Sequence, residues 1–242
     1  RKRMEQALWQ AHKLESIGIL AGGIAHDFNN LLVAIMGHSS LAMRQLPEDS
    51  RPRKSITKAV KAAERASELT RQLLAYSGQG KFEVRVLSLN NLITDNLHLF
   101  RIAIPKNIIL HTDLDDKLPN IEVDLVQIQQ VIMNLLINAS DALEGQPGQI
   151  TIQTTCIRLT HDESTPWFGQ QEELPSGCYV HLVVQDNGRG ILEEQLHHIF
   201  DPFFTTKEKG HGLGLAAVLG IVRSHHGALR VHSELGQGTR FE

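Results

Sequence analysis

The sequence predicts an α-helical hairpin, which we expect to pair into a dimeric four-helix bundle, followed by an α+β domain. Two observations lead to this fold class. Near the N-terminus, apolar residues recur at alternating intervals of three and four, which is typical of a helix packed against other helices. Later in the chain, short β-branched runs alternate with helical segments. We therefore expect a hairpin domain at residues 1–80 and a mixed domain at residues 81–242.

The first helix is predicted from Met4 to about Leu46, a stretch without proline. Pro47 and Pro52 bracket a polar turn, and a second helix is predicted at Arg53–Tyr76. One hairpin cannot cover its own apolar stripe, so we expect a homodimer; the alternative is a monomeric hairpin docked on the following domain. The stripe follows heptad positions a and d: Leu14, Ile17, Ala21, Ile24, Phe28, Leu31 and Ile35.

A linker at Ser77–Lys81 leads into the second domain, where strand and helix patterns are mixed. Helices are predicted at Leu89–Phe100, Asp124–Leu143 and Leu213–Ser224. Strands are predicted at Ile108–Thr112, Ile150–Leu159, Tyr179–Gln185 and, as the final strand, Ala228–Ser233. This order favours an α+β sandwich, in which helices back one sheet.

The composition restricts the partners. The 242 residues are 41% hydrophobic and 21% charged, as in ordinary globular proteins. A formal net charge of -3 gives no reason to expect nucleic acid or an anionic membrane as a partner. No apolar run reaches the roughly 18 residues of a membrane span, so no membrane contact is expected. Two cysteines suit a reducing compartment. We expect a cytoplasmic fragment of a longer protein, whose other parts could be membrane-anchored.

His26 is a candidate nucleophile. It falls at heptad position f, farthest from the apolar seam, and is therefore expected to face solvent. Asp27 is its neighbour, and Asn30 is four residues on, hence on the same helix face. A carboxylate can hold one imidazole N–H and leave the other nitrogen free to attack, and a carboxamide can position a water. The alternative is a plain surface histidine.

Two carboxamides on one predicted helix are candidate ligands for a metal and a phosphate. Asn134 and Asn138 are four residues apart and so share a helix face. Mg²⁺ takes oxygen ligands and usually shares them with substrate phosphates. The same pair on an amphipathic helix is also compatible with a solvated polar face.

Glycine-rich segments suggest a nucleotide site. Asp186 ends a predicted strand, and Gly188 and Gly190 after it would let the backbone approach a flat base. A carboxylate there can accept a hydrogen bond from the amino group of adenine. Gly212 and Gly214 precede a predicted helix, whose free N–H groups favour phosphate. The P-loop sequence is absent from the chain.

The run Leu20–Leu32, with His-Asp-Phe-Asn-Asn inside it, resembles the H box of sensor histidine kinases. The resemblance implies that His26 is the autophosphorylation site and that Asp27 is the general base. It also implies that Asn30 assists a phosphatase activity. Most members have Glu beside the histidine, so Asp27 marks a variant of the pattern.

Four later segments resemble the N, G1, F and G2 boxes of the ATP-binding domain of that family: Gln130–Leu143, Asp186–Ile191, Phe200–Lys207 and Gly210–Leu215. The resemblance implies the Bergerat sandwich of DNA gyrase, Hsp90 and MutL, a last strand at 238–242, and ATP and Mg²⁺ as cofactors. It implies these roles: Asn134 and Asn138 at Mg²⁺ and phosphate, Asp186 on adenine, Gly188 and Gly190 around the base, Phe203 and Phe204 at a lid hinge, and Gly212, Leu213 and Gly214 at the phosphate-binding helix start.

One position departs from the family pattern. Many members have Lys three residues after the second Asn, where this chain has Asp141. The cation for the phosphates must therefore come from elsewhere, and we expect Lys207 or Arg189 to supply it.

The predicted function is that of an ATP-dependent protein-histidine kinase that phosphorylates His26 and then an aspartate of a response-regulator receiver domain. Related ATPases have a water-activating glutamate where this chain has Asn134, and a carboxamide is no base near neutral pH. Bound ATP should therefore persist until His26 attacks it. The alternatives are an ATPase or chaperone module of the same fold and a pseudokinase scaffold or net phosphatase.

Overall fold

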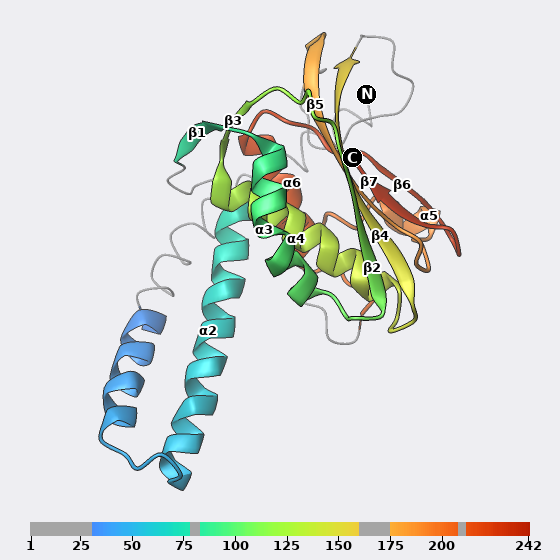
Figure 1. The fold of residues 1–242 in the computed structure, drawn as a ribbon. Helices are drawn as coiled ribbons and strands as arrows, with labels where there is room; N and C mark the ends of the chain where they lie inside the picture. Colours follow the sequence, from blue (N-terminus) through green and yellow to red (C-terminus); the bar gives the residue numbers. More distant parts are fainter. Residues whose placement is uncertain (1–30, 78–82, 160–174, 208–211) are drawn as a thin grey trace, which may run out of the picture. The chain divides into compact units, whose positions relative to one another are not determined.

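The computed structural model describes residues 31–77, 83–159, 175–207 and 212–242. The chain divides into two compact units, Arg1–Gly80 and Lys81–Glu242, which are described separately below (Figure 1). The predicted phosphoacceptor His26 and its neighbours Asp27 and Asn30 lie outside the described residues. Within the described ranges, no helix is both long enough and apolar enough to cross a bilayer.

The first unit contains the predicted helical hairpin. Residues 31–44 are helical, and helix α2 spans Arg51–Ser77 after a short turn. The guanidinium Nη1 of Arg53 donates to the carbonyl of Leu46 at 3.0 Å and closes that turn. Pro52 lies in the first turn of α2, where its missing N–H costs no helical hydrogen bond.

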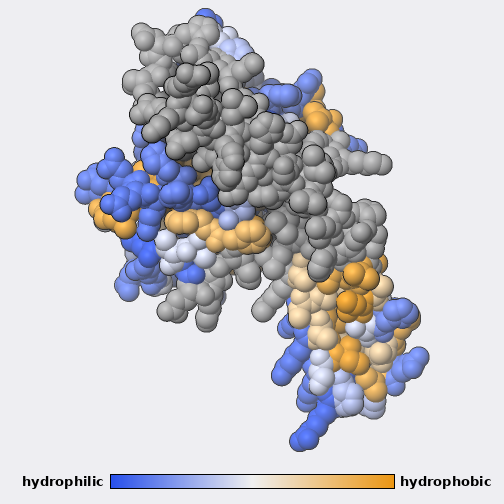
Figure 2. Space-filling view, turned by 180° about the vertical axis from the view of Figure 1, so that it is seen from behind, coloured by the Kyte–Doolittle hydropathy of each residue, from blue (hydrophilic) through white to orange (hydrophobic). Residues whose placement is uncertain are grey.

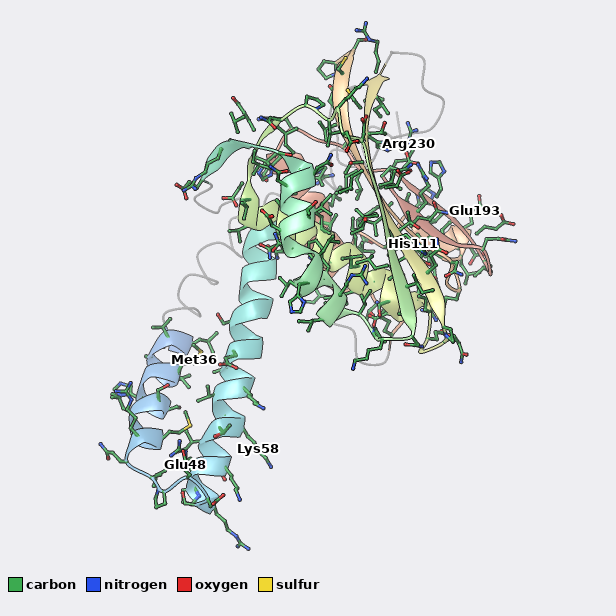
Figure 3. All side chains as sticks on the ribbon, in the orientation of Figure 1. Met36, Glu48, Lys58, His111, Glu193 and Arg230 are labelled. Atoms are coloured by element: carbon green, nitrogen blue, oxygen red, sulfur yellow. The ribbon has the colours of Figure 1, made fainter. Side chains whose placement is uncertain are left out.

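The N-terminal helix of the hairpin has two apolar faces. Leu32, Met36 and Met43 are buried or half-buried, and Met43 Sδ lies 3.5 Å from the hydroxyl of Thr57 on α2. Leu31 and Ile35 lie on a neighbouring face and are 62% and 50% exposed. Figure 2 shows apolar residues gathered on the hairpin, and Figure 3 shows Lys58 of α2 pointing away from the other helix. The hairpin therefore leaves two predicted seam residues, Leu31 and Ile35, uncovered.

The second unit is an α+β sandwich, which confirms the predicted fold class. Its five-stranded sheet has the order β2-β4-β5-β7-β6, with β2 parallel to β4 and the other pairs antiparallel. β1 (Val84–Leu87) and β3 (Ile121–Asp124) form a separate antiparallel pair. The strands of the larger sheet are β2 (Ile108–Leu114), β4 (Gly148–Leu159), β5 (Gly177–Asp186), β6 (Val231–Glu234) and β7 (Gly238–Phe241).

Three helices lie together on one side of the five-stranded sheet (Figure 1). They are α3 (Leu89–Ala103), α4 (Leu125–Ala142) and α6 (Gly214–Ser224), and a short helix α5 (Glu193–Leu196) contacts β6. Burial of apolar side chains between these helices and the sheet is the main favourable term in folding this unit. The almost fully buried residues include Phe100, Ile132, Leu136, Ile150, Ile152, Val184 and Ile221.

Asp124 fixes the start of α4. Its Oδ1 accepts hydrogen bonds from the backbone N–H groups of Val126 and Gln127, at 2.9 and 3.1 Å. Its Oδ2 accepts from the N–H of Glu83 at 2.8 Å, just before β1. A capping carboxylate satisfies helix N–H groups that have no partner within the helix. The helix that carries Asn134 and Asn138 is therefore anchored at its N-terminus.

The C-terminal strands correct one sequence prediction. The sequence pattern predicts the final strand at Ala228–Ser233, but β6 begins at Val231 and β7 follows it. β7 agrees with the strand that the family resemblance implied at 238–242. β1, β3 and α5 are not predicted by the sequence pattern, because a run of four residues is too short to show a period.

Candidate nucleotide site

Asn134 and Asn138 share one face of α4, and this face meets the start of α6. The carboxamide Nδ2 of Asn134 donates to the carbonyl of Gly214 at 3.3 Å. A Cβ added to Gly214 would lie 3.8 Å from Nδ2 of Asn138 and 3.9 Å from Oδ1 of Asn134. Asn134 is buried, with 8% of its surface exposed, and Asn138 is half-buried. The two carboxamides and the predicted phosphate-binding helix start therefore form one site.

The N-terminus of α6 lies beside the two carboxamides of α4. Its N-cap residue is Leu213, and among the described residues no side chain makes a capping hydrogen bond there. The first N–H groups of a helix have no partner within the helix, and together with the helix dipole they favour an anion. This end of α6 has the properties of a phosphate site.

Lys207 brings a cation to the predicted metal ligand. Its Nζ donates to Oδ1 of Asn138 at 3.0 Å and to Oδ2 of Asp141 at 2.8 Å. Arg189 instead donates to Oε1 of Glu144 at 3.0 Å and to the hydroxyl of Thr206 at 3.1 Å. Of the two cations expected near the phosphates, Lys207 is the one that contacts Asn138.

Asp186 is buried at the end of β5, with 4% of its surface exposed. Its Oδ1 accepts hydrogen bonds from the backbone N–H groups of Gly188 and Thr239, at 2.8 and 3.3 Å. Both bonds go to Oδ1, which leaves Oδ2 to accept a hydrogen bond from a base. Burial raises the pKa of Asp186, and the two backbone hydrogen bonds oppose that rise.

Gly188 and Gly190 lie where backbone segments touch. A Cβ at Gly188 would lie 2.6 Å from the carbonyl oxygen of Ala142, at the end of α4. Gly190 has φ +73°, and a Cβ there would lie 2.1 Å from the carbonyl oxygen of Glu234. A larger residue fits neither position, so both glycines let the segment after Asp186 pack against α4 and β6.

Phe203 and Phe204 lie against the turn that precedes α6. The N–H of Phe203 donates to the carbonyl of Gly212 at 2.9 Å. Phe203 has φ +68°, which is uncommon outside glycine, and its side chain is 65% exposed. A Cβ at Gly212 would lie 2.4 Å from the carbonyl carbon of Phe203. The lid-hinge role of the two phenylalanines stays a prediction, since residues 208–211 lie outside the described ranges.

Two polar residues that the sequence pattern did not indicate, Thr239 and Ser233, support Asp186. Thr239 donates its N–H to Asp186, and its Oγ1 lies 2.9 Å from Oγ of Ser233. The hydroxyl oxygen of Ser233 also accepts from the N–H of Ile191 at 2.8 Å. The available signal was Gly238, which lies in a Gly-x-Gly-Thr run, and a Cβ there would lie 2.0 Å from the carbonyl oxygen of Asp186.

The donor set of this site fits Mg²⁺ and a nucleotide. Oδ1 of Asn138 already faces a cation, the ammonium group of Lys207. Carboxamide oxygens next to substrate phosphates are suitable Mg²⁺ ligands. The uncapped start of α6 suits the phosphates, and the buried carboxylate of Asp186 suits an adenine amino group.

Comparison with known proteins agrees with both units. Residues 16–79 match the family described as "His Kinase A (phospho-acceptor) domain", and residues 123–242 match "Histidine kinase-, DNA gyrase B-, and HSP90-like ATPase". Sensor kinase CckA of Brucella abortus is 39% identical over 244 residues, covering 100% of this chain and 25% of that protein. Sensor histidine kinase ZraS of Escherichia coli is 32% identical over 242 residues, covering 100% and 48%. The chain therefore spans half or less of these relatives.

Solved structures show the same fold. The catalytic domain of histidine kinase ThkA is 30% identical with a TM-score of 0.51, covering 66% of this chain and 93% of that domain. ThkA in complex with response regulator protein TrrA is 27% identical with a TM-score of 0.56, covering 99% and 64%. The second unit is an ATPase domain of the type shared by histidine kinases, gyrase B and HSP90. The chain belongs to the sensor histidine kinase family.

Proposed function

We propose that this chain is the catalytic core of a sensor kinase, which binds Mg-ATP, phosphorylates its own His26 and passes the phosphoryl group to a response-regulator aspartate. The contact between Lys207 and Asn138 is the observation that supports the proposal best. It joins a cation to a predicted Mg²⁺ ligand beside the uncapped start of α6. The family matches to both units support the same function.

Each end of the nucleotide has its own residues in this proposal. The buried carboxylate of Asp186 accepts a hydrogen bond from the adenine amino group through Oδ2. The N–H groups at the start of α6, after Leu213, bind the phosphates. Asn134 and Asn138 hold Mg²⁺, which when bound neutralises phosphate charge. Lys207 supplies the cation that many relatives have on the helix itself.

The transfer to His26 needs little covalent chemistry from the protein. One imidazole nitrogen forms a bond to the γ-phosphorus, the bond from that phosphorus to the bridging oxygen breaks, and ADP leaves. Asp27 holds the N–H of the other nitrogen, which fixes the reactive tautomer, and as general base it takes that proton when the P–N bond forms. In the second transfer the P–N bond breaks and a P–O bond forms on the receiver aspartate.

Asn134 favours a kinase over an ATPase of the same fold. Its carboxamide donates to the carbonyl of Gly214 and cannot take a proton from water near neutral pH. The γ-phosphate is therefore protected from hydrolysis until a separate nucleophile arrives. Phosphoryl transfer then depends mainly on in-line placement of His26 and on charge neutralisation.

The partners follow from the hairpin and from the relatives. Leu31 and Ile35 expose an apolar stripe, and a second hairpin would cover it in a four-helix bundle. The solved complex of ThkA with the response regulator TrrA supports a receiver domain as the second partner. We place this core in the cytoplasm, where a response regulator would meet it, with no role for nucleic acid or membrane contact.

Labelling with γ-³²P-ATP in the presence of Mg²⁺ tests the proposal. The wild-type chain should carry phosphate that is lost in acid and survives alkali, as phosphohistidine does. His26→Ala should abolish this label and retain ATP binding, and Asp27→Asn should slow labelling by roughly 10²–10⁴-fold. Undiminished labelling of His26→Ala would overturn the assignment of the phosphoacceptor.

A further inference from the structure

We propose that Asp141 is a positioning residue of the nucleotide site, which holds Lys207 at the phosphate end without itself contacting nucleotide. Oδ2 of Asp141 accepts from Nζ of Lys207 at 2.8 Å, and the same Nζ donates to Asn138 at 3.0 Å. Asn138 and Asp141 are three residues apart and therefore share a face of α4. The inference rests on the proposed function of this site in binding Mg-ATP.

The position of Asp141 on α4 is unfavourable for the helix itself. It lies in the last turn, where the carbonyl ends carry partial negative charge, and that turn contains no basic residue. A cation is the favourable side chain at this place. Lys207 supplies one from a segment 66 residues further along the chain. The ion pair with Lys207 thus compensates for a carboxylate at a position where the helix dipole disfavours negative charge.

The three N–H donors of Lys207 explain why an anchor is needed. The structure uses one donor for Asn138 and one for Asp141. Mg²⁺ on Oδ1 of Asn138 would repel the ammonium group and remove the first of these bonds. Asp141 then remains as the anchor, and two donors are available for phosphate oxygens.

The exposure of the pair suits movement. The side chains of Lys207 and Asp141 are 33% and 48% exposed, and ion pairs of this kind contribute little to folding stability. The residues just before Lys207 have hydrogen bonds of their own that do not involve Asp141. The N–H of Lys207 donates to the hydroxyl of Thr205 at 3.1 Å, and Arg189 donates to the hydroxyl of Thr206. Asp141 is therefore the residue that sets the position of the ammonium group relative to Asn138.

Calorimetric titration of the whole chain with adenosine, ADP and ATP, with and without Mg²⁺, tests this inference. Lys207→Ala should weaken Mg-ATP binding by about tenfold or more and leave adenosine binding unchanged, since only the triphosphate meets the cation. Asp141→Asn should weaken Mg-ATP binding by roughly three- to tenfold. Asp141→Glu keeps the carboxylate and should restore most of the affinity.

The direction of the Asp141→Asn effect is diagnostic. A carboxylate that contributed only its charge would repel the triphosphate, so its neutralisation would tighten ATP binding. Tighter or unchanged binding would therefore overturn the inference. Glu144→Gln is the matched control, because Glu144 is the neighbouring acid but pairs with Arg189; we expect its Mg-ATP affinity to equal that of the wild type.

A double-mutant cycle separates positioning from a structural role. If Asp141 acts through Lys207, Asp141→Asn should cause no further loss of affinity in the Lys207→Ala background. An equal loss in both backgrounds would contradict this. Failure of the wild-type chain to bind Mg-ATP would refute the proposed function instead, so the two failures can be told apart.

Discussion

The backbone N–H of Asp124 donates a 2.9 Å hydrogen bond to Nε2 of His225 and so joins the start of α4 to the end of α6. Nδ1 of His225 lies 2.9 Å from the carbonyl of Ile221. A carbonyl only accepts and an N–H only donates, so the imidazole carries its proton on Nδ1. The bond helps to fix α4 and α6 relative to each other. Asn134 of α4 and Gly214 of α6 meet at the predicted phosphate site.

His225→Ala should lower the free energy of unfolding by about 1–3 kcal/mol, because it leaves the part-buried N–H of Asp124 without its acceptor. Urea unfolding of the whole chain measures this. The control is His98→Ala, which removes an exposed imidazole from α3 and should change stability by less than about 0.5 kcal/mol. Equal losses of unfolding free energy in the two variants would show that the hydrogen bond from Asp124 to His225 does not account for the effect.

Asp186→Asn should weaken adenosine binding by about tenfold or more, since the amide Nδ2 would meet the adenine amino group as a second donor. Oδ1 of the new side chain can still accept from Gly188 and Thr239, so the fold should persist. Adenosine titration and a circular dichroism spectrum measure the two effects. Unchanged adenosine affinity would remove Asp186 from base recognition.

The same variant has a predictable pH dependence. The pKa of Asp186 is raised by burial, so the folded wild type retains its proton more readily than the unfolded chain. Its contribution to stability is present below the ordinary carboxyl pKa of about 3.9 and is lost as the pH rises through the raised pKa. The stability of Asp186→Asn relative to wild type should therefore increase across that window. If the stability of Asp186→Asn relative to wild type instead fell as the pH rose, the predicted direction of the pH dependence would be wrong.

Gly212→Ala should reduce ATP affinity much more than Gly145→Ala. Both glycines have positive φ, +65° and +78°, so either alanine incurs roughly 1–2 kcal/mol of backbone strain. A Cβ at Gly145 meets nothing within 4 Å, whereas at Gly212 it would collide with the backbone of Phe203. Denaturation of the two variants measures the cost of backbone strain, and ATP titration measures the effect of the collision on nucleotide binding. Equal ATP affinities would exclude a role for this close approach in nucleotide binding.

Ile35→Lys should shift the chain from dimer to monomer, whereas Val33→Lys should not. Both residues are exposed apolar side chains of one helix, 50% and 67% exposed, but only Ile35 continues the heptad seam. Burying such a side chain in a bundle contributes about 1.5–3 kcal/mol. Sedimentation velocity at micromolar concentration gives the oligomeric state. A wild type that sediments as a monomer throughout would refute the four-helix bundle.

The sequence predicted those site features that lie within one element. Asn134 and Asn138 are four residues apart on a helix, so their shared face follows from helix geometry alone. A helix start with free N–H groups at α6 follows likewise from glycines before an apolar helical run. The spacing of Leu31 and Ile35 places both in the predicted seam, and both are exposed within the hairpin.

Contacts between distant segments could not be predicted in this way. Lys207 was one of two candidate cations, and only the fold shows that it contacts Asn138 while Arg189 bonds Glu144. Thr239 was missed because it reaches Asp186 through its backbone N–H, which any residue except proline carries. A side-chain motif is visible in a sequence, but a backbone donor becomes specific only through strand pairing.

The bond from Thr239 to Asp186 spans 53 residues, and β7 pairs with β5 over two residue pairs. The ribosome synthesises the chain from its N-terminus, so Asp186 emerges well before Thr239, whose backbone N–H holds the carboxylate in place. A nascent or truncated chain that stops before β7 contains the carboxylate but lacks this support. Ligand binding stabilises only a folded site. Cellular ATP would thus protect completed copies of this domain from proteolysis and leave unfinished ones exposed to it.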